Sequence, residues 1–255
     1  MIYYFSGTGN TRLVAQRLAS LLGDQALPIG TTSPPTLSDK DERIGFVFPV
    51  YGWDVPPVMA EFIRNVKVAS QPSYIYMVCT CGDDIGHTDR RFYRLLAEKD
   101  VKCQGAWSIL MPDTYIGLPG FDIDPQEEIA QKLQQAEKQI DAIAQHIKQK
   151  EQIVSVKNGR FAWSKTYILG KAFHRWLTGE HKFRTTDACN RCGKCAKVCP
   201  LNNITMSDSG PTRHGHCADC LACYHHCPKR AIEYGRFSKG KGQYKIPPYW
   251  NKSNT

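Results

Sequence analysis

The feature that most limits what this chain can fold into is a pair of cysteine runs with the same spacing. In each run three cysteines are separated by two residues, and a fourth follows after three more residues, directly before a proline. The eight positions are Cys189, Cys192, Cys195, Cys199, Cys217, Cys220, Cys223 and Cys227. Thiolates at this spacing let a tight turn wrap three corners of an iron–sulfur cubane, and the fourth cysteine of each run reaches the other cubane. The spacing therefore predicts two [4Fe–4S] clusters.

The crossing of the fourth cysteines predicts which thiolates share a cluster. The first cluster is expected to use Cys189, Cys192, Cys195 and Cys227, and the second Cys217, Cys220, Cys223 and Cys199. The alternative is a pair of zinc sites, which also use Cys-x-x-Cys but need neither the third cysteine nor the Cys-Pro ending. The charged or titratable residues within the runs either raise the cluster potentials or are simply solvated, and they are Lys194, Lys197, His225 and His226.

Cysteine usage and charge limit the setting of the chain. Eleven cysteines in a chain of 255 residues without a visible export signal favour metal binding in a reducing cytoplasm over disulfides. Residues 151–255 carry 18 Lys and Arg against 6 Asp and Glu, which suggests nucleic acid. However, oxidised clusters with four thiolates are anionic, and they lie in that same half. We therefore expect redox protein partners, no nucleic acid, and no membrane span.

The first half has the pattern of an α/β fold. Short apolar runs at residues 1–5, 44–50, 74–81 and 106–111 suit parallel strands buried on both faces. Helical patterns at residues 11–22, 56–66, 88–97 and 125–150 alternate with them. This alternation predicts a doubly wound sheet. We expect a first domain at residues 1–155, a connecting helix or linker at 156–186, and a small cysteine-rich domain at 187–255.

The segment at residues 161–179 is amphipathic and allows two interpretations. Its apolar side holds Leu169, Ala172, Phe173, Trp176 and Leu177. The opposite side holds Lys171, His174 and Arg175. A membrane-surface helix fits this composition. The simpler interpretation, which we favour, is a connecting helix docked between the two domains.

A loop rich in hydrogen-bond donors follows the first predicted strand. Gly7 and Gly9 allow close approach of the backbone to a ligand, and the helix that begins here points its N–H groups at the same place. The loop lacks the lysine of a Walker motif, and a simple helix-capping turn is the alternative. The predicted anion-binding residues are Ser6, Gly7, Thr8, Gly9, Asn10 and Thr11.

Two more candidate segments end predicted strands, at the edge where open parallel sheets bind ligands. The first contains two aromatic side chains that suit packing on a flat ring, although Trp53 could equally pack in the core. The second holds a turn whose backbone could meet a ligand edge. The residues are Pro49, Val50, Tyr51, Gly52, Trp53, Thr80, Cys81, Gly82 and Asp83.

Residues 6–11 and the turn at residues 81–83 resemble those of flavodoxins. That resemblance implies a five-stranded flavodoxin-like sheet and an FMN whose phosphate lies in the loop. The chain departs from the pattern after Asp84, where Ile85, Gly86 and His87 offer no second aromatic ring. The cysteine region resembles a bacterial-type two-cluster ferredoxin with an α+β fold.

Together, the two regions resemble flavodoxin–ferredoxin fusion proteins of the EFR type. The resemblance also draws on residues 111–115 and on a tail around Lys241, Tyr244 and Pro247. It implies electron transfer within one chain between FMN and two [4Fe–4S] clusters, as a redox carrier between low-potential donors and a partner. The alternative is a flavin-dependent reductase of a small substrate, acting at an open flavin face.

Overall fold

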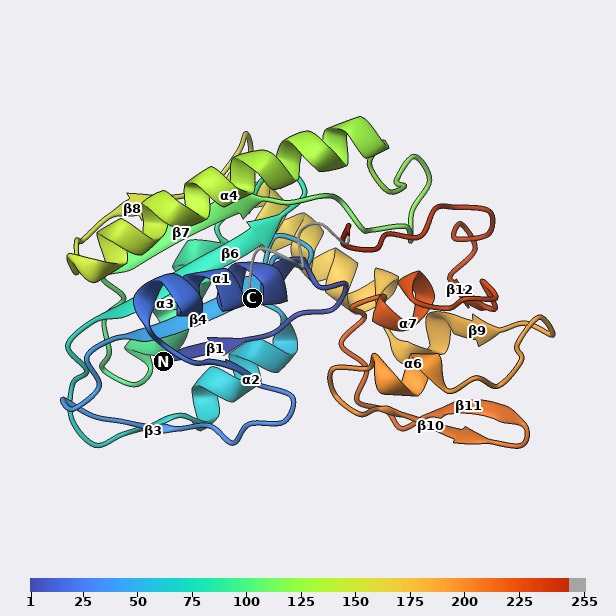
Figure 1. Cartoon of the computed structure of the whole chain (residues 1–255), viewed down its shortest axis with the longest axis horizontal. Helices are drawn as coiled ribbons and strands as arrows, with labels where there is room; N and C mark the ends of the chain where they lie inside the picture. Colours follow the sequence, from blue (N-terminus) through green and yellow to red (C-terminus); the bar gives the residue numbers. More distant parts are fainter. Residues whose placement is uncertain (248–255) are drawn as a thin grey trace.

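The structure is a computed structural model of the chain, and it describes residues 1–247. The first half forms a six-stranded, all-parallel sheet in the order β2-β1-β4-β6-β7-β8 (Figure 1). Its strands are β1 (Ile2–Tyr4), β2 (Ala26–Pro28), β4 (Ile44–Pro49), β6 (Ile75–Cys81), β7 (Gly105–Leu110) and β8 (Val154–Ser155). The doubly wound α/β class is confirmed, but the sheet has six strands where five were expected. The difference is β8, a two-residue edge strand too short to leave an apolar signal.

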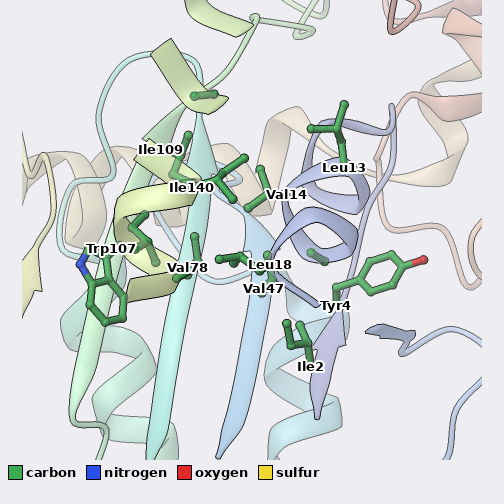
Figure 2. Close-up of a cluster of buried hydrophobic side chains, with 14 of the residues drawn as sticks. Ile2, Tyr4, Leu13, Val14, Leu18, Val47, Val78, Trp107, Ile109 and Ile140 are labelled. Carbon is green, nitrogen blue, oxygen red and sulfur yellow. The ribbon is translucent and has the colours of Figure 1, made fainter. Parts of the chain in front are cut away.

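Helices cover both faces of this sheet. Helices α1 (Asn10–Leu22) and α4 (Gln126–Lys148) pack on one face, and α2 (Pro57–Asn65) and α3 (Thr88–Ala97) on the other. Figure 2 shows Leu18 of α1 and Ile140 of α4 meeting Val47 and Val78 of the sheet. Along β4, Val47 faces α1 while Phe46 and Phe48 face the opposite layer. Burial on both faces explains why the central strands are continuously apolar. A separate two-stranded parallel pair joins β3 (Thr36–Leu37) to β5 (Lys67–Val68).

A single helical segment links the two halves. It consists of α5 (Ala162–Ser164) followed by the wide π-helical turns η1 (Lys165–Gly170) and η2 (Phe173–Leu177). We call residues 162–177 the connecting helix. A short 3₁₀ turn, η3 (Glu180–Lys182), follows. No helix within residues 1–247 is long and apolar enough to cross a membrane.

The C-terminal part is small and built from short elements. Strand β9 (Phe183–Thr185) pairs antiparallel with β12 (Ile232–Tyr234), and β10 (Ile204–Ser207) with β11 (Gly210–Arg213). Two single-turn helices, α6 (Lys194–Lys197) and α7 (Ala222–His225), carry the third cysteine of each run. Strand β9, which pairs with β12, lies inside the segment 156–186 that was expected as a linker.

The chain then returns to the first domain. The ammonium of Lys241 donates to the carbonyl oxygen of Ile116 at 3.0 Å, and the hydroxyl of Tyr244 donates to Asn10 Oδ1 at 2.6 Å. His225 joins the three parts, because its Nε2 lies 2.8 Å from Thr114 O and its Nδ1 accepts the Tyr244 N–H at 2.9 Å. A carbonyl only accepts and an amide N–H only donates, so this imidazole carries its proton on Nε2. Its burial lowers the pKa of His225 to about 4.

Candidate functional site

The eight predicted ligand cysteines line two separate cavities. One cavity is lined by Cys189, Cys192, Cys195 and Cys227, and the other by Cys199, Cys217, Cys220 and Cys223. The fourth cysteine of each run therefore faces the cavity of the other run. We call these the first and second cysteine cavities. Within residues 1–247, no three His, Cys, Asp or Glu side chains converge as ligands of one metal ion must.

The two runs share one backbone conformation. Residues with positive φ occur at equivalent places in each run: Arg191 and Asp219, Gly193 and Leu221, Asn202 and Arg230. Non-glycine residues adopt this region rarely, so its repetition marks a turn that the runs need. Backbone N–H groups also point at the fourth thiols: Asn203 N lies 3.3 Å from Cys199 Sγ, and Ala231 N lies 3.2 Å from Cys227 Sγ. Such donors stabilise a thiolate, which is the form that binds metal.

Arg213 is a half-buried charged side chain beside the second cysteine cavity. It ends β11 and its guanidinium carbon lies 4.9 Å from the centre of the Phe183 ring. Burial raises the pKa of the Cys223 thiol to about 11, and the guanidinium of Arg213 opposes that rise. The Nε and Nη2 atoms of Arg213 are buried and find no hydrogen-bond partner within the described chain. A half-buried cation whose donor atoms face the cavity suits an anionic group there.

The donor loop after β1, residues 6–11, packs against the C-terminal half of the chain. A Cβ placed on Gly7 would lie 2.5 Å from Cys220 O, and one on Gly9 would lie 2.6 Å from Ile246 Cδ1. The Ser6 hydroxyl oxygen is buried and has no partner among residues 1–247. A buried hydroxyl in that state suits an anionic ligand, because an unmade hydrogen bond is costly there.

Other side chains of the loop are already engaged. Asn10 donates from Nδ2 to Pro112 O at 3.0 Å, and the Thr11 hydroxyl pairs with that of Thr80 at 2.7 Å. Asn10 and Thr11 thus hold the loop to the ends of neighbouring strands. Thr8 is half-buried in the loop. The donors facing a ligand would accordingly be the backbone N–H groups and the hydroxyls of Ser6 and Thr8.

A large pocket of about 970 Å³ opens at the carboxyl ends of the strands. The structure brings nine of the predicted residues together in its lining: Pro49, Val50, Tyr51, Gly52, Trp53, Thr80, Cys81, Gly82 and Asp83. The six loop residues do not line it directly. They lie beside it, since the Cβ position of Gly7 is 3.1 Å from the hydroxyl of Tyr51. The volume is near the top of the range for small-molecule sites.

A tight turn presents two aromatic residues of the pocket. Tyr51 and Asp54 exchange backbone hydrogen bonds of 3.2 and 3.1 Å, and both residues between them have positive φ, 55° for Gly52 and 56° for Trp53. Two positive values in succession define a type I′ turn, which strains a tryptophan. Lys165 of the connecting helix lies 5.6 Å from the centre of the Trp53 ring. Lys165 thereby contacts the turn from the connecting helix.

The connecting helix supplies part of the pocket wall, which the sequence interpretation missed. Gly170 packs directly on the carbonyl of Gly52, and the hydroxyl of Thr166 donates to Trp53 O at 3.0 Å. Phe173 lines the pocket 5.5 Å from the ring of Tyr115. The pocket thus contains further aromatic rings, although the segment after Asp84 has none. No local pattern could have revealed this contact, because the residues are distant in sequence.

The cysteine-rich unit supplies another wall of the same pocket. Cys217, Ala218, Asp219, Cys220 and Leu221 all line it. The pocket and the second cysteine cavity therefore share residues 201, 217, 218, 220 and 221. A ligand in the pocket would be separated from the second cavity by little more than one turn of backbone.

Comparison with known proteins agrees with this two-part organisation. Residues 1–106 match the family model of a flavodoxin domain, and residues 188–232 match that of a 4Fe-4S dicluster domain. No curated protein matches the chain.

Several solved structures resemble the first half. A Streptococcus pneumoniae flavodoxin shares 17% identity over 56% of this chain and 97% of its own, with a TM-score of 0.34. A Fusobacterium nucleatum flavodoxin bound to flavin mononucleotide shares 14% over 59% and 96%, with a TM-score of 0.37. An NAD(P)H:quinone oxidoreductase from Methanothermobacter marburgensis shares 11% over 56% and 94%, with a TM-score of 0.34. Scores this low carry no functional conclusion. The family matches show that the chain joins an N-terminal flavodoxin domain to a C-terminal 4Fe-4S dicluster domain, a pairing that supports a flavin and iron–sulfur electron-transfer role.

Proposed function

We propose that this chain binds one FMN in the large pocket and two [4Fe–4S] clusters in the cysteine cavities, and that it transfers electrons between them. On this proposal residues 1–155 hold the flavin, residues 156–186 connect the domains, and residues 187–255 hold the clusters, with residues 248–255 lying outside the described part. The observation that carries the proposal is the wall at residues 217–221, of which Cys217, Ala218, Cys220 and Leu221 line both the pocket and a cysteine cavity. A flavin supplies two-electron and one-electron chemistry, whereas each cluster supplies single electrons.

The residues present fit the phosphate end of FMN. Ser6 offers a buried hydroxyl that has no partner among residues 1–247. Gly7 and Gly9 let the C-terminal half approach the loop closely, since a Cβ on either would meet Cys220 O or Ile246. The loop opens α1, whose first turn holds no acidic residue and whose N-terminal N–H groups favour an anion. Tyr51 and Trp53 would pack against the ring system, and residues 80–83 would meet its polar edge.

The surroundings of the cavities suggest an order for the relay. The second cavity adjoins the pocket through Cys220, while the first cavity includes Cys192, which is exposed. A cluster in the second cavity would exchange electrons with the flavin. A cluster in the first cavity would exchange them with an external redox partner.

A stopped-flow experiment tests this order. The holoprotein is mixed anaerobically with a chemically reduced two-cluster ferredoxin, and loss of flavin absorbance is followed. The wild type should contain one FMN and about eight irons per chain. Cys220→Ser should keep its flavin, lose roughly half of its iron, and reduce its flavin at least about tenfold more slowly. Cys199→Ser, which alters the same cavity from the other run, should behave alike.

Cys103→Ser provides the matched control, because Cys103 lies outside both cavities and its thiol donates to Gly105 O at 3.1 Å. It should leave iron content and rate unchanged. Unaltered flavin reduction in both cavity variants would refute the relay. Absence of flavin or of iron from the anaerobically purified wild type would refute the cofactor assignment itself.

A second candidate function is reduction of a small substrate at the flavin. The pocket is large for one ligand and has an apolar wall of Leu118, Phe121 and Leu169. This wall suits an apolar acceptor beside the flavin. Steady-state turnover of small acceptors by the cluster-depleted but flavin-loaded chain would favour this function over the carrier role.

A further inference from the structure

The outward side of the connecting helix exposes an apolar face. Trp176 keeps 66% and Trp163 60% of their surface exposed, and Ile168 and Leu169 are about half exposed. Phe161, directly before the helix, keeps 67% of its surface exposed. The inward side, at Thr166 and Gly170, is buried against the turn at residues 51–54. The predicted docked face is therefore wrong in part, because Leu169 and Trp176 do not dock. Docking uses the small residues Gly170 and Thr166, which permit close approach.

The same segment is uniformly basic. Between Glu151 and Glu180 the chain holds no acidic residue. Lys157 and Lys165 pair with Asp83 and Asp84 of the first domain.

Three other cations, Arg160, Lys171 and Arg175, have no carboxylate within ion-pair distance among residues 1–247. The exposed aromatic and aliphatic side chains thus lie among unpaired positive charges.

We infer that the connecting helix docks this chain onto an anionic lipid surface. Exposed Trp, Phe, Ile and Leu on one helix face, flanked by Lys and Arg, are the features of helices that lie in the headgroup region of a bilayer. Tryptophan favours that region because its ring is apolar and its N–H is polar. Basic residues add attraction to anionic headgroups. The inference stands on these exposed residues and does not depend on which cofactors the chain binds.

The charges also argue against a second copy of the chain as the occupant. A second copy of the chain would set Lys171 and Arg175 against the same residues of its partner, since a two-fold contact repeats one patch on both sides. No acidic residue of the segment could offset that repulsion. An acidic protein surface would also complement these cations, so binding to anionic vesicles is the observation that separates a lipid surface from a protein partner.

Docking would also orient the large pocket. Leu169 belongs to the exposed face and lines the pocket, as Leu177 does at the end of the helix. The pocket rim would therefore meet the lipid surface, while the exposed Cys192 belongs to the cavity that does not adjoin the pocket.

Vesicle sedimentation with the cofactor-loaded full chain tests the inference. The chain should bind vesicles made of phosphatidylcholine and phosphatidylglycerol in equal parts, and should bind pure phosphatidylcholine much more weakly. The double variant Lys171→Glu and Arg175→Glu should lose at least about 25-fold in affinity, since each basic residue near an anionic surface is worth about fivefold. Trp176→Ala should lose roughly tenfold.

Phe237→Ala and Lys239→Glu are matched controls, because both side chains are exposed outside the connecting helix. They should bind like the wild type. No binding to anionic vesicles would overturn the inference, and so would equal losses in the controls. A concentration-dependent dimer abolished by Trp176→Ala, without vesicle binding, would assign the face to a second copy instead. Because all substituted side chains are exposed, the variants should retain wild-type circular dichroism.

Discussion

The hydrogen bond between the C-terminal tail and the donor loop permits a sharp test of how the halves are held together. The Tyr244 hydroxyl donates to Asn10 Oδ1 at 2.6 Å, with Tyr244 1% and Asn10 8% exposed. Tyr244→Phe keeps the ring and removes only this donor. Asn10 would still donate to Pro112, but its carbonyl oxygen would be left in a buried place without that partner.

Leaving a buried acceptor unpaired costs about 1–3 kcal/mol. If the tail opens while the rest of the chain stays folded, that cost destabilises the docked tail relative to the open tail. The fraction of molecules with an open tail then rises roughly fivefold to 150-fold. The Tyr244 N–H reports this opening directly, because it donates to His225 Nδ1 when the tail is docked. We therefore expect amide exchange in residues 241–247 to accelerate by this factor, while the strands of the parallel sheet keep their protection.

Native-state hydrogen exchange followed by mass spectrometry is the assay. Tyr76→Phe is the control, because the Tyr76 hydroxyl is buried but has no hydrogen-bond partner within the described residues. Its removal should leave tail exchange unchanged. Tail exchange in Tyr244→Phe within twofold of the wild type would show that this hydrogen bond does not hold the tail, and the reasoning would fail.

Three further substitutions examine the site. Gly7→Ala places a Cβ 2.5 Å from Cys220 O, where backbone must shift at about 1–3 kcal/mol, so exchange in residues 217–221 should rise; unchanged exchange would contradict the contact. Ser6→Ala removes the unpartnered hydroxyl and should weaken FMN binding roughly tenfold by fluorescence titration, whereas equal affinity would remove Ser6 from the phosphate site. Arg213→Gln takes a half-buried cation from the cavity containing Cys223, and should lower the midpoint potential of one cluster by on the order of 60 mV in an EPR-monitored titration, with the other cluster unchanged.

Local patterns made much of the site predictable. Four central strands are readable because burial on both faces requires continuous apolar runs, and the carboxyl ends of parallel strands must meet at one edge. That rule alone gathers Tyr51, Trp53 and Cys81, which the structure places in one pocket. The cysteine spacing is equally local, since one turn of backbone determines where neighbouring thiols point.

Contacts between distant segments were not predictable. Phe173 enters the pocket because Gly170 lets the connecting helix sit on the carbonyl of Gly52, and neither residue signals the other in sequence. Tyr244 lies in a glycine-rich basic tail that resembles loop, yet it is buried against Asn10. Arg213 has the sequence context of a surface strand. In each case burial depends on a partner that lies more than a hundred positions away or on another strand. The local hydrophobic pattern of the sequence therefore does not indicate it.

The wall at residues 217–221 has a consequence for how such a protein matures. The flavodoxin domain lacks one side of its pocket until the cysteine turn at Cys217 and Cys220 is in place. A cluster bound by these thiols would fix the conformation of that turn. Iron loading should accordingly tighten the binding of flavin, and a chain made under iron starvation should bind FMN more weakly than the iron-loaded chain, although an excess of FMN still fills the pocket. The contact at residues 217–221, which shortens the electron-transfer distance, would thereby also link the loading of iron to the binding of flavin.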